Sequence, residues 1–556
     1  MDNKPENSPD TTGNESVGIP APEGPANLID TDYKIGQDNY QAAPMGVNID
    51  IHGAVFTVSS LVILAFVILS LALPEQSTDW FGAAKNWINS NMTWFILLSA
   101  NIFVVLCLVL IVSPMGKVRI GGAHAKPDFG YLAWFSMLFA AGMGVGLMFY
   151  GVSEPMTHYG TALAGTSMGE NGVRTDWAPL GAAAGDEGAA LSLGMAATIF
   201  HWGLHPWAIY AIVALSLAIF AYNKGLPLTV RSMFYPILGE RIWGWPGHVI
   251  DILAVFATLF GLATSLGIGA QQAAAGLNHL FGIPGGDTTL VLLITGITAV
   301  AIVSIVAGVD KGVKRLSEIN LVLAFLLLMF VVFVGPTLMI LTGFAKNLGS
   351  YLTELPFLSN PFAREDANFS QGWTTFYWAW WISWSPFVGM FIARVSRGRS
   401  VREFLTAVLL IPSTVSVFWM TAFGTTAIAQ LQEGFEGAKN ADLAVQLFEV
   451  LGQMPLTEIT SFVGIVLVIV FFITSSDSGS LVIDTITAGG KIDAPKPQRV
   501  FWGIIEGAIA IALLVGGGLA ALQSAAVAMG LPFTVVLLAG CYAIVKGLMN
   551  EPRGAK

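Results

Sequence analysis

Long apolar stretches without charges dominate the pattern of hydrophobic and polar positions along this chain. A helix needs about 20 apolar residues to cross the roughly 30 Å of hydrocarbon in a bilayer. Twelve stretches reach that length, so the pattern predicts an all-α polytopic membrane protein with 12 transmembrane helices. The predicted spans are 53–73, 92–114, 130–151, 188–222, 247–279, 288–309, 319–344, 372–394, 402–430, 456–478, 499–517 and 521–548.

Composition agrees with the apolar pattern. Of the 556 residues, 54% are hydrophobic and only 11% are charged, whereas soluble domains contain about 25% charged residues. So few charges cannot cover a surface that faces water, and most of the surface must therefore face lipid.

The first 50 residues differ from the rest in composition. They are acidic and rich in Pro, Gly, Asn and Ser, and they lack the basic start and apolar run of a signal peptide. Because such a segment cannot bury a core, we expect residues 1–50 to form a disordered acidic tail. Residues 51–548 are expected to form the twelve-helix domain, and residues 549–556 a short second tail.

The distribution of Lys and Arg among the loops predicts the orientation. Loops on the same side as the two termini contain 19 of the 26 Lys and Arg residues, and the opposite loops contain five. Loops rich in Lys and Arg stay on the cytoplasmic side of a membrane. We therefore expect a multi-pass protein of the cell inner (plasma) membrane with both termini in the cytoplasm.

Three glycines alternate in the middle of the third span, in Gly142-Met143-Gly144-Val145-Gly146. Each glycine weakens a helix by roughly 1 kcal/mol relative to alanine. An opened backbone at this depth is tolerated where it lines a cavity, and its free carbonyl and amide groups can bind a cation or a carboxylate. Close helix packing through small residues explains the same pattern equally well.

Aromatic residues gather in the fourth and eighth spans, each time near a proline. Five tryptophans lie within 373–384, and Pro386, which can interrupt the helix, follows them. Trp202 and Trp207 flank Pro206, which is expected to break the fourth span. Anchoring at the membrane interface would explain either cluster alone. Both together favour an aromatic box for a quaternary ammonium group, which cannot donate N–H hydrogen bonds and binds through cation–π attraction.

The tenth span ends in hydroxyl side chains, in Thr474-Ser475-Ser476. Hydroxyl and carbonyl oxygens are hard ligands that suit a small alkali cation. Hydrogen bonding of these hydroxyls back to their own helix is the alternative explanation.

The sequence contains no pattern that indicates an enzyme. No Asp, Glu, Lys or Arg lies within 131–151, so a proton relay through a carboxylate there is excluded. His201 and His205 are four residues apart but lack the HExxH pattern, and we expect them to pack or hydrogen-bond rather than bind a metal. We expect no enzymatic activity and no cofactor.

Together these motifs resemble the betaine/choline/carnitine transporter (BCCT) family. The resemblance covers residues 45–548 and is densest in the stretches AAGMGVGLMFYG, FHWGLHPWAIY and WWISWSPFVGMF.

The resemblance implies an architecture and a set of partners. The fold would be LeuT-like, with two inverted repeats of five helices at about 130–344 and 372–548, and the first two spans would be additions. The expected partners are a small zwitterionic or cationic osmolyte, sodium, the lipid bilayer and two further copies in a homotrimer, and no nucleic acid.

The resemblance also implies site residues. The substrate-binding positions are Trp202, Trp207, Tyr210, Trp380, Trp381, Trp384, Gly142, Met143, Gly144 and Gly146. The sodium site is formed by Ala140, Met143, Phe471, Thr474 and Ser475. Thr258 and Phe387 match a second sodium site, in which Leu262 stands where the family has a second threonine.

The function implied by the resemblance is sodium-coupled symport of a compatible solute, glycine betaine first, by alternating access. Proton-coupled choline transporters have Asp at the position of Gly146, and carnitine exchangers have an arginine in the fifth span, which this chain lacks. Dimethylsulfoniopropionate, ectoine, proline, choline and carnitine remain alternative solutes. A sodium-independent exchanger and a channel remain alternative mechanisms. The short C-terminal tail leads us to expect little intrinsic activation by osmotic stress.

Overall fold

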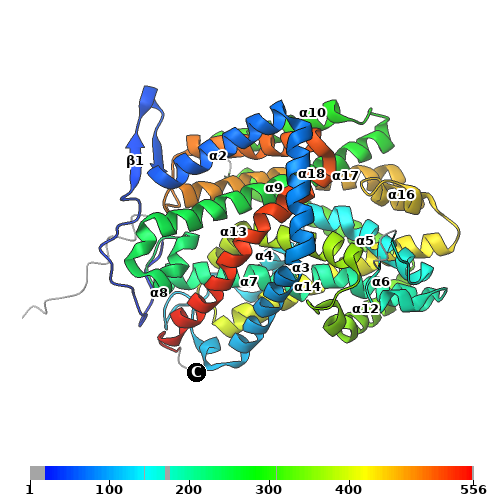
Figure 1. Cartoon of the computed structure of the whole chain (residues 1–556), viewed down its shortest axis with the longest axis horizontal. Coiled ribbons are helices and arrows are strands. Elements are labelled where there is room, and N and C mark those ends of the chain that lie inside the picture. Colours follow the sequence, from blue (N-terminus) through cyan, green and yellow to red (C-terminus); the bar gives the residue numbers. More distant parts are fainter. Residues whose placement is uncertain (1–18, 143, 170–173, 175, 308–309, 554–556) are drawn as a thin grey trace, which may run out of the picture.

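The computed structural model describes residues 19–553 apart from 143, 170–173, 175 and 308–309. In that part the chain is built almost entirely of helices, with one two-stranded antiparallel hairpin (Figure 1). The long helices are α2 (Gly53–Ala72), α3 (Pro74–Val112), α4 (Tyr131–Gly142), α5 (Val145–Ala164), α6 (Glu187–Trp202), α7 (Leu204–Ala218), α9 (Trp245–Phe281), α10 (Asp287–Ala307), α11 (Asp310–Val334), α12 (Thr337–Leu358), α13 (Thr375–Val395), α14 (Val401–Gln432), α17 (Thr457–Thr487) and α18 (Lys496–Met549). The shorter elements are β1 (Asn39–Ala42), β2 (Ile49–His52), α8 (Tyr235–Leu238), α15 (Gly437–Asn440), α16 (Gln446–Gly452) and several single turns.

Each predicted span overlaps with one of the long helices. Within the described residues, nine helices are long and apolar enough to cross a membrane, or ten if the bent pair of α4 and α5 forms one span. Helix α18 covers two predicted spans, and its backbone is not helical at Gly517 and Gly518. The chain is therefore a multi-pass membrane protein, and the number of twelve spans stays a prediction.

Large apolar side chains point outward on the peripheral helices. Val112 of α3 is 78% exposed and Phe333 of α11 is 72% exposed. Contiguous apolar surface of this kind is not stable in water, and it is the surface that lipid tails cover.

Two prolines behave differently from one another. The predicted span 319–344 is divided at Pro336, where α11 has ended and α12 begins, because proline cannot continue the hydrogen-bond ladder of the preceding helix. Pro386 lies inside α13, which continues to Val395. The suggested interruption after the tryptophan cluster is therefore absent from this described helix.

Two helix breaks shape the centre of the molecule. The axes of Tyr131–Ala141 and Val145–Ala164 are bent by 63° across the alternating glycines. Helices α6 and α7 are separated at Gly203, whose ψ of −128° does not belong to a helix. The sequence predicted this second break beside Pro206, but in the structure it lies three residues earlier, at Gly203.

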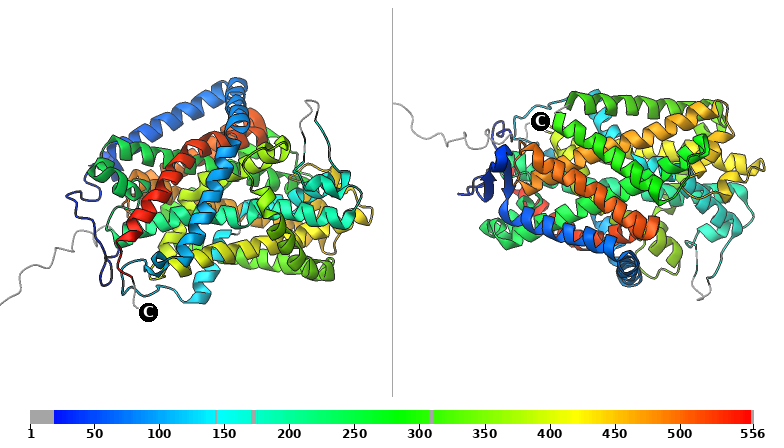
Figure 2. Two further views of the ribbon diagram at one scale, coloured as in Figure 1. Left: turned by 60° about the horizontal axis from the view of Figure 1, so that its bottom comes forward. Right: turned by 90° about the horizontal axis from the view of Figure 1, so that it is seen from above.

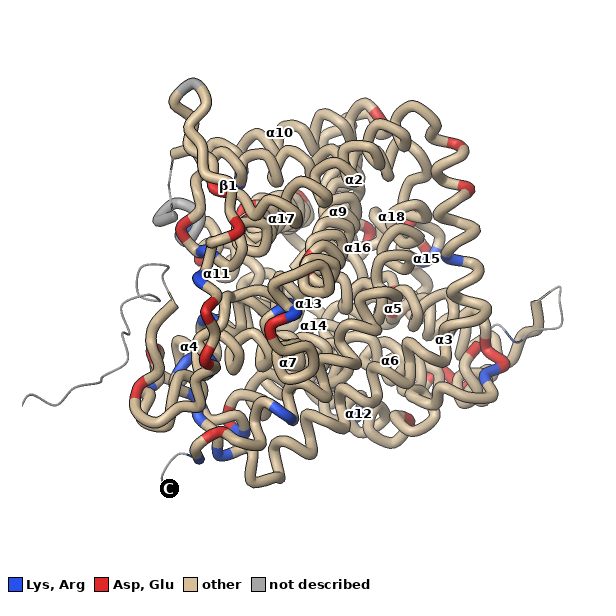
Figure 3. Tube along the Cα trace, turned by 60° about the vertical axis from the view of Figure 1, so that its left-hand side comes forward, with Lys and Arg blue, Asp and Glu red and all other residues tan. Residues whose placement is uncertain are grey.

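Many long helices run side by side through the body of the protein, and the blue α3 crosses others steeply (Figure 2). Helix α9 packs against α17 and α18, and α13 packs against α7 and α18. Most Lys and Arg residues lie toward the end of the molecule that carries the C-terminus, whereas long parts of the helices carry no charge (Figure 3). The charges and the apolar helices are thus separated in space, as they are along the sequence.

The N-terminal segment corrects one prediction. Residues 1–50 were expected to be disordered, but residues 19–50 have a defined structure against the loops, and β1 pairs with β2. The Lys491 ammonium donates to the Asp50 carboxylate over 2.6 Å, and the Arg397 guanidinium donates to Glu23 over 2.7 Å. Composition rules out a buried core for this segment, but it cannot reveal polar contacts to distant loops. Residues 1–18 lie outside the described part.

Candidate functional site

Six tryptophan and tyrosine residues line one cavity of about 50 Å³, which we call the box cavity. Phe472 of α17 also lines this cavity, whereas the six tryptophan and tyrosine residues come from α6, α7 and α13. They are Trp202, Trp207, Tyr210, Trp380, Trp381 and Trp384. The structure thus brings together all six aromatic positions that the resemblance assigns to substrate binding.

The rings of the box meet in orientations that suit a cation. The rings of Trp202 and Trp381 are 5.0 Å apart and nearly perpendicular, at 74°, and those of Trp207 and Tyr210 are 5.3 Å apart at the same angle. Tyr210 lies 6.2 Å from Trp381. Perpendicular neighbours expose ring faces from different directions, and a cation between them is attracted by more than one face.

Hydrogen bonds fix the tryptophans of α13. The Trp381 indole donates to the backbone carbonyl of His201 over 3.0 Å, and the Trp380 indole donates to the Ser265 hydroxyl over 3.1 Å. Helix α13 is thereby joined to the end of α6 and to α9 at the level of the box cavity.

The alternating glycines lie against this cavity. Gly144 and Gly146 line it, Gly142 is the last residue of α4, and Met143 lies outside the described residues. A Cβ atom on Gly146 would be 2.8 Å from the Trp202 ring and 3.0 Å from the Trp380 ring. Such contacts are too close for a methyl group, so glycine at position 146 lets the backbone approach the aromatic box.

Most of the predicted sodium site lines a second cavity of about 460 Å³, which extends to Arg394 and which we call the Arg394 vestibule. Ala140, Phe471, Thr474 and Ser475 all line it, whereas Met143 is not described. Ser475 also lines the box cavity. Ser475, like Ala141 and Trp384, therefore lies between the two cavities.

The Thr474 hydroxyl also hydrogen-bonds back to its own helix, which is the alternative explanation that the sequence left open. Its hydroxyl donates to the Val470 carbonyl over 3.0 Å. The hydroxyl oxygen keeps its acceptor lone pairs after this bond, so back-bonding and cation binding are compatible at this position.

The predicted second sodium pair is Thr258 and Phe387. Phe387 lines the Arg394 vestibule, with its ring 5.2 Å from that of Trp384. The Thr258 hydroxyl donates within α9 to Ala254 over 2.7 Å, and Thr258 is not among the described residues that line either cavity. Among the described residues, Thr258 and Phe387 therefore do not both line either of these two cavities, and the second sodium site stays a prediction.

A third cavity of about 620 Å³ lies on the other side of the box; it is lined by His158, Phe369 and Trp373 among others, and we call it the His158 vestibule. Stacked rings separate it from the box. Trp373 stacks on Tyr377 at 6.3 Å, and Tyr377 stacks on Trp381 at 5.9 Å. The box cavity thus has a vestibule on either side, with an aromatic stack toward one of them.

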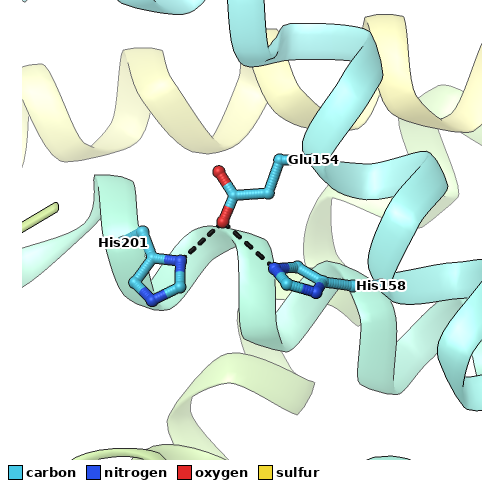
Figure 4. Close-up of side chains that lie close together, drawn as sticks. All are labelled: Glu154, His158 and His201. Carbon is cyan, nitrogen blue, oxygen red and sulfur yellow. Dashed lines mark hydrogen bonds and ion pairs between the residues drawn. The ribbon is translucent and has the colours of Figure 1, made fainter. Parts of the chain in front are cut away.

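Sequence reasoning missed a buried carboxylate beside the box. Glu154 of α5 is fully buried, and one of its oxygens faces both His158 and His201 (Figure 4). The polar atoms of these three residues lie within 4.8 Å of one another, which is close enough to hold a metal ion. The available signal was the charged residue itself, because a carboxylate inside a membrane helix marks function by default.

Broken helices around an aromatic cavity, with a vestibule on either side, are typical of secondary transporters in membranes. The family model of the betaine/carnitine/choline family transporters, BCCT, matches residues 54–553. The chain belongs to this family. The resemblance found in the sequence is confirmed, and the protein is a transporter rather than an enzyme.

Individual relatives support this assignment along the whole chain. A glycine betaine/proline/choline transporter of Vibrio parahaemolyticus is 64% identical over 537 residues, which are 96% of this chain and 97% of that protein. The glycine betaine transporter OpuD of Bacillus subtilis is 42% identical over 506 residues, covering 90% and 96%. Among solved structures, a Na⁺-coupled sialic acid symporter is similar with a TM-score of 0.43 and 14% identity, covering 81% of this chain and 86% of that one.

Proposed function

We propose that this protein is a sodium-coupled symporter of a small compatible solute, with glycine betaine as its first substrate. The observation that carries the proposal is the convergence of six tryptophan and tyrosine side chains and the Ser475 hydroxyl on one cavity. Tryptophan faces bind trimethylammonium groups without needing an N–H donor from the ligand, and each desolvated contact contributes about 2 kcal/mol.

The choice of solute follows from the box and from the relatives. Two close relatives are named for glycine betaine together with proline and choline, and one of them also for ectoine. All four solutes carry a positive charge on nitrogen or in an amidinium group, and so suit a box of aromatic faces. Carnitine, which carries a quaternary ammonium, and dimethylsulfoniopropionate, which carries a sulfonium, remain alternatives, because aromatic faces attract both cations.

Coupling to sodium is supported by the position of Ser475. A ligand biases a conformational equilibrium only if it binds the two states unequally. Ser475 lines the solute cavity and also the vestibule that contains Ala140, Phe471 and Thr474. A sodium ion at these oxygens would order the wall of the solute cavity, and each ligand would strengthen the binding of the other.

Alternating access would follow from the two vestibules. The His158 vestibule and the Arg394 vestibule lie on opposite sides of the box cavity. Opening one while the other closes would expose the solute first to one side of the membrane and then to the other. The stack of Trp373, Tyr377 and Trp381 would close the path from the His158 vestibule.

The proposed topology has twelve spans with both termini in the cytoplasm of an inner-membrane protein. The bent pair of α4 and α5 adds one span to the nine long apolar helices. Division of α18 at Gly517 and Gly518 adds another, and α13, with the box tryptophans, adds the last. We further propose the five-plus-five inverted repeat at 130–344 and 372–548, and assembly as a homotrimer.

Uptake of labelled glycine betaine into proteoliposomes tests the solute. We expect saturable uptake that unlabelled choline, proline, ectoine, carnitine and dimethylsulfoniopropionate inhibit to different degrees. The strongest inhibitor identifies the preferred solute class. Flux that increases linearly with glycine betaine concentration, without competition, would indicate a channel and contradict the proposal.

A further inference from the structure

The buried carboxylate of Glu154 accepts four hydrogen bonds. Its Oε2 atom accepts from the Trp202 indole over 2.7 Å and from the Tyr377 hydroxyl over 2.6 Å. Its Oε1 atom faces the Nδ1 atom of His201 at 2.5 Å and the Nε2 atom of His158 at 3.2 Å. The side chain is completely shielded from solvent, so these four groups replace its hydration.

The donors come from different helices that build the box. Glu154 and His158 lie on α5, His201 and Trp202 end α6, and Tyr377 lies on α13. The backbone of His201 in turn accepts the Trp381 indole. The Glu154 carboxylate therefore contacts Trp202 directly. It also contacts Tyr377, whose ring stacks on Trp381, and it is linked to Trp381 through His201.

Hydrogen-bond geometry indicates that Glu154 accepts hydrogen bonds from its neighbours rather than binds a metal ion with them. Both histidines direct a ring nitrogen at the same oxygen of Glu154 (Figure 4), and the second nitrogen of His201 lies 2.9 Å from the Thr374 hydroxyl. A carboxylate offers about four acceptor positions, and the four contacts occupy them. A metal ion would have to displace the two histidine bonds that already satisfy this oxygen.

We propose that Glu154 is a positioning residue for solute recognition, which fixes the Trp202 indole and the Tyr377 phenol and strengthens the attraction of the box for a cation. The role in recognition rests on the function proposed above, whereas the role in geometry does not. An anion that accepts the indole N–H increases the electron density of that ring, because hydrogen-bonded groups polarise one another at low dielectric. A ring face with more electron density attracts a quaternary ammonium more strongly.

Glu154→Gln tests the proposal with almost no change in size. The glutamine amide keeps one oxygen that accepts hydrogen bonds. Its NH₂ group is itself a donor and would face two of the four groups that donate to Glu154. Glu506→Gln is the matched control, because Glu506 is equally buried, in α18, and is bonded to Ser476 and to no residue of the box. We expect the KM for glycine betaine to increase on the order of tenfold in E154Q. We expect the maximal rate of E154Q and the KM of E506Q each to change by less than about twofold.

A second measurement does not depend on the solute. In protein labelled with 5-fluorotryptophan, the ¹⁹F signal of Trp202, assigned through Trp202→Phe, should shift in E154Q. The signal of Trp384, whose indole nitrogen has no hydrogen-bond partner among the described residues, should not shift. Tyr377→Phe combined with E154Q should raise the KM by less than the product of the two single effects, because both act on one bond.

The outcomes separate this inference from the proposed function. Wild-type protein that transports none of the solutes, while E154Q still shifts the Trp202 signal, would refute the function and retain the positioning role. An unmoved Trp202 signal, or equal losses in E154Q and E506Q, would overturn the inference. One equivalent of Zn²⁺ that wild-type protein retains against a chelator and E154Q loses would also overturn it, in favour of a metal site.

Discussion

The indole nitrogen of Trp381 donates a hydrogen bond to the backbone carbonyl of His201 over 3.0 Å, which joins α13 to the last turn of α6. This contact holds the Trp381 ring nearly perpendicular to Trp202 in the wall of the box cavity. The ring and the hydrogen bond can be removed separately, and this separation defines the first prediction.

Trp381→Leu should lower the affinity for glycine betaine by roughly 30-fold, because a desolvated cation–π contact contributes about 2 kcal/mol. Trp381→Phe is the control, since it keeps an aromatic face, although a smaller one, and loses the hydrogen bond. Its affinity should lie between those of the wild type and the leucine variant. Uptake kinetics in proteoliposomes measure both, and wild-type affinity in Trp381→Leu would refute the box.

Gly146→Ala should weaken glycine betaine binding by at least about tenfold, because the new methyl group would lie 2.8 Å from the Trp202 ring and force it to move. Gly160→Ala, on the same helix α5, serves as the control, because its methyl group would meet no atom of the described residues within 4 Å apart from its chain neighbours and its own helix backbone. Titration of tryptophan fluorescence with glycine betaine reports the affinity. Similar affinities in the two variants would mean that the solute does not depend on the Trp202 position.

Thr474→Ala combined with Ser475→Ala should raise the sodium concentration for half-maximal uptake on the order of tenfold, since two hard oxygen ligands are lost. Thr460→Ala removes a comparable hydroxyl from the same helix, one that bonds back to Leu456, and should leave the sodium requirement unchanged. Uptake measured against sodium concentration at constant ionic strength distinguishes the variants. An unchanged requirement in the double variant would place the ion elsewhere.

His52 should make the folded protein less stable in mild acid. Burial, and then the nearby Arg231 guanidinium, lower the pKa of His52 from 6.5 to about 3. Between these values the unfolded chain binds a proton that the folded chain does not, so stability falls as the pH decreases from 6.5 toward 3. Above pH 6.5 the group has no effect.

His52→Asn tests this dependence, because asparagine can still accept from the Val55 amide at the start of α2, as His52 does, but does not titrate. Between pH 7 and pH 5, the thermal unfolding midpoint of the variant should fall by about 2 to 4 °C less than that of the wild type. Parallel pH profiles for the two proteins would show that His52 does not contribute.

The sequence predicted the elements that depend on local pattern. Apolar length located the helices, and alternating glycines located the bend between α4 and α5. Partners distant in sequence could not be predicted in this way. The contacts of Glu23 with Arg397 and of Asp50 with Lys491 order a segment whose composition indicates disorder.

The candidate site shows the same division. The aromatic residues were identifiable because their type and density are unusual in a membrane helix. The role of Glu154 depends on donors from three helices, and that convergence exists only in the folded chain. The broken helix after Trp202 was expected beside Pro206, but the non-helical residue is Gly203, where a Cβ atom would lie 2.9 Å from the Ile199 carbonyl oxygen and 3.2 Å from the Tyr351 ring.

Accumulation of glycine betaine against its gradient tests the central claim most directly. Proteoliposomes are loaded with potassium and diluted into either sodium or potassium at equal osmolality, with the membrane potential clamped. We predict that an inward sodium gradient drives the internal glycine betaine concentration well above the external one, and that potassium supports only equilibration. Equal accumulation in both salts, or flux only against preloaded solute, would contradict sodium-coupled symport.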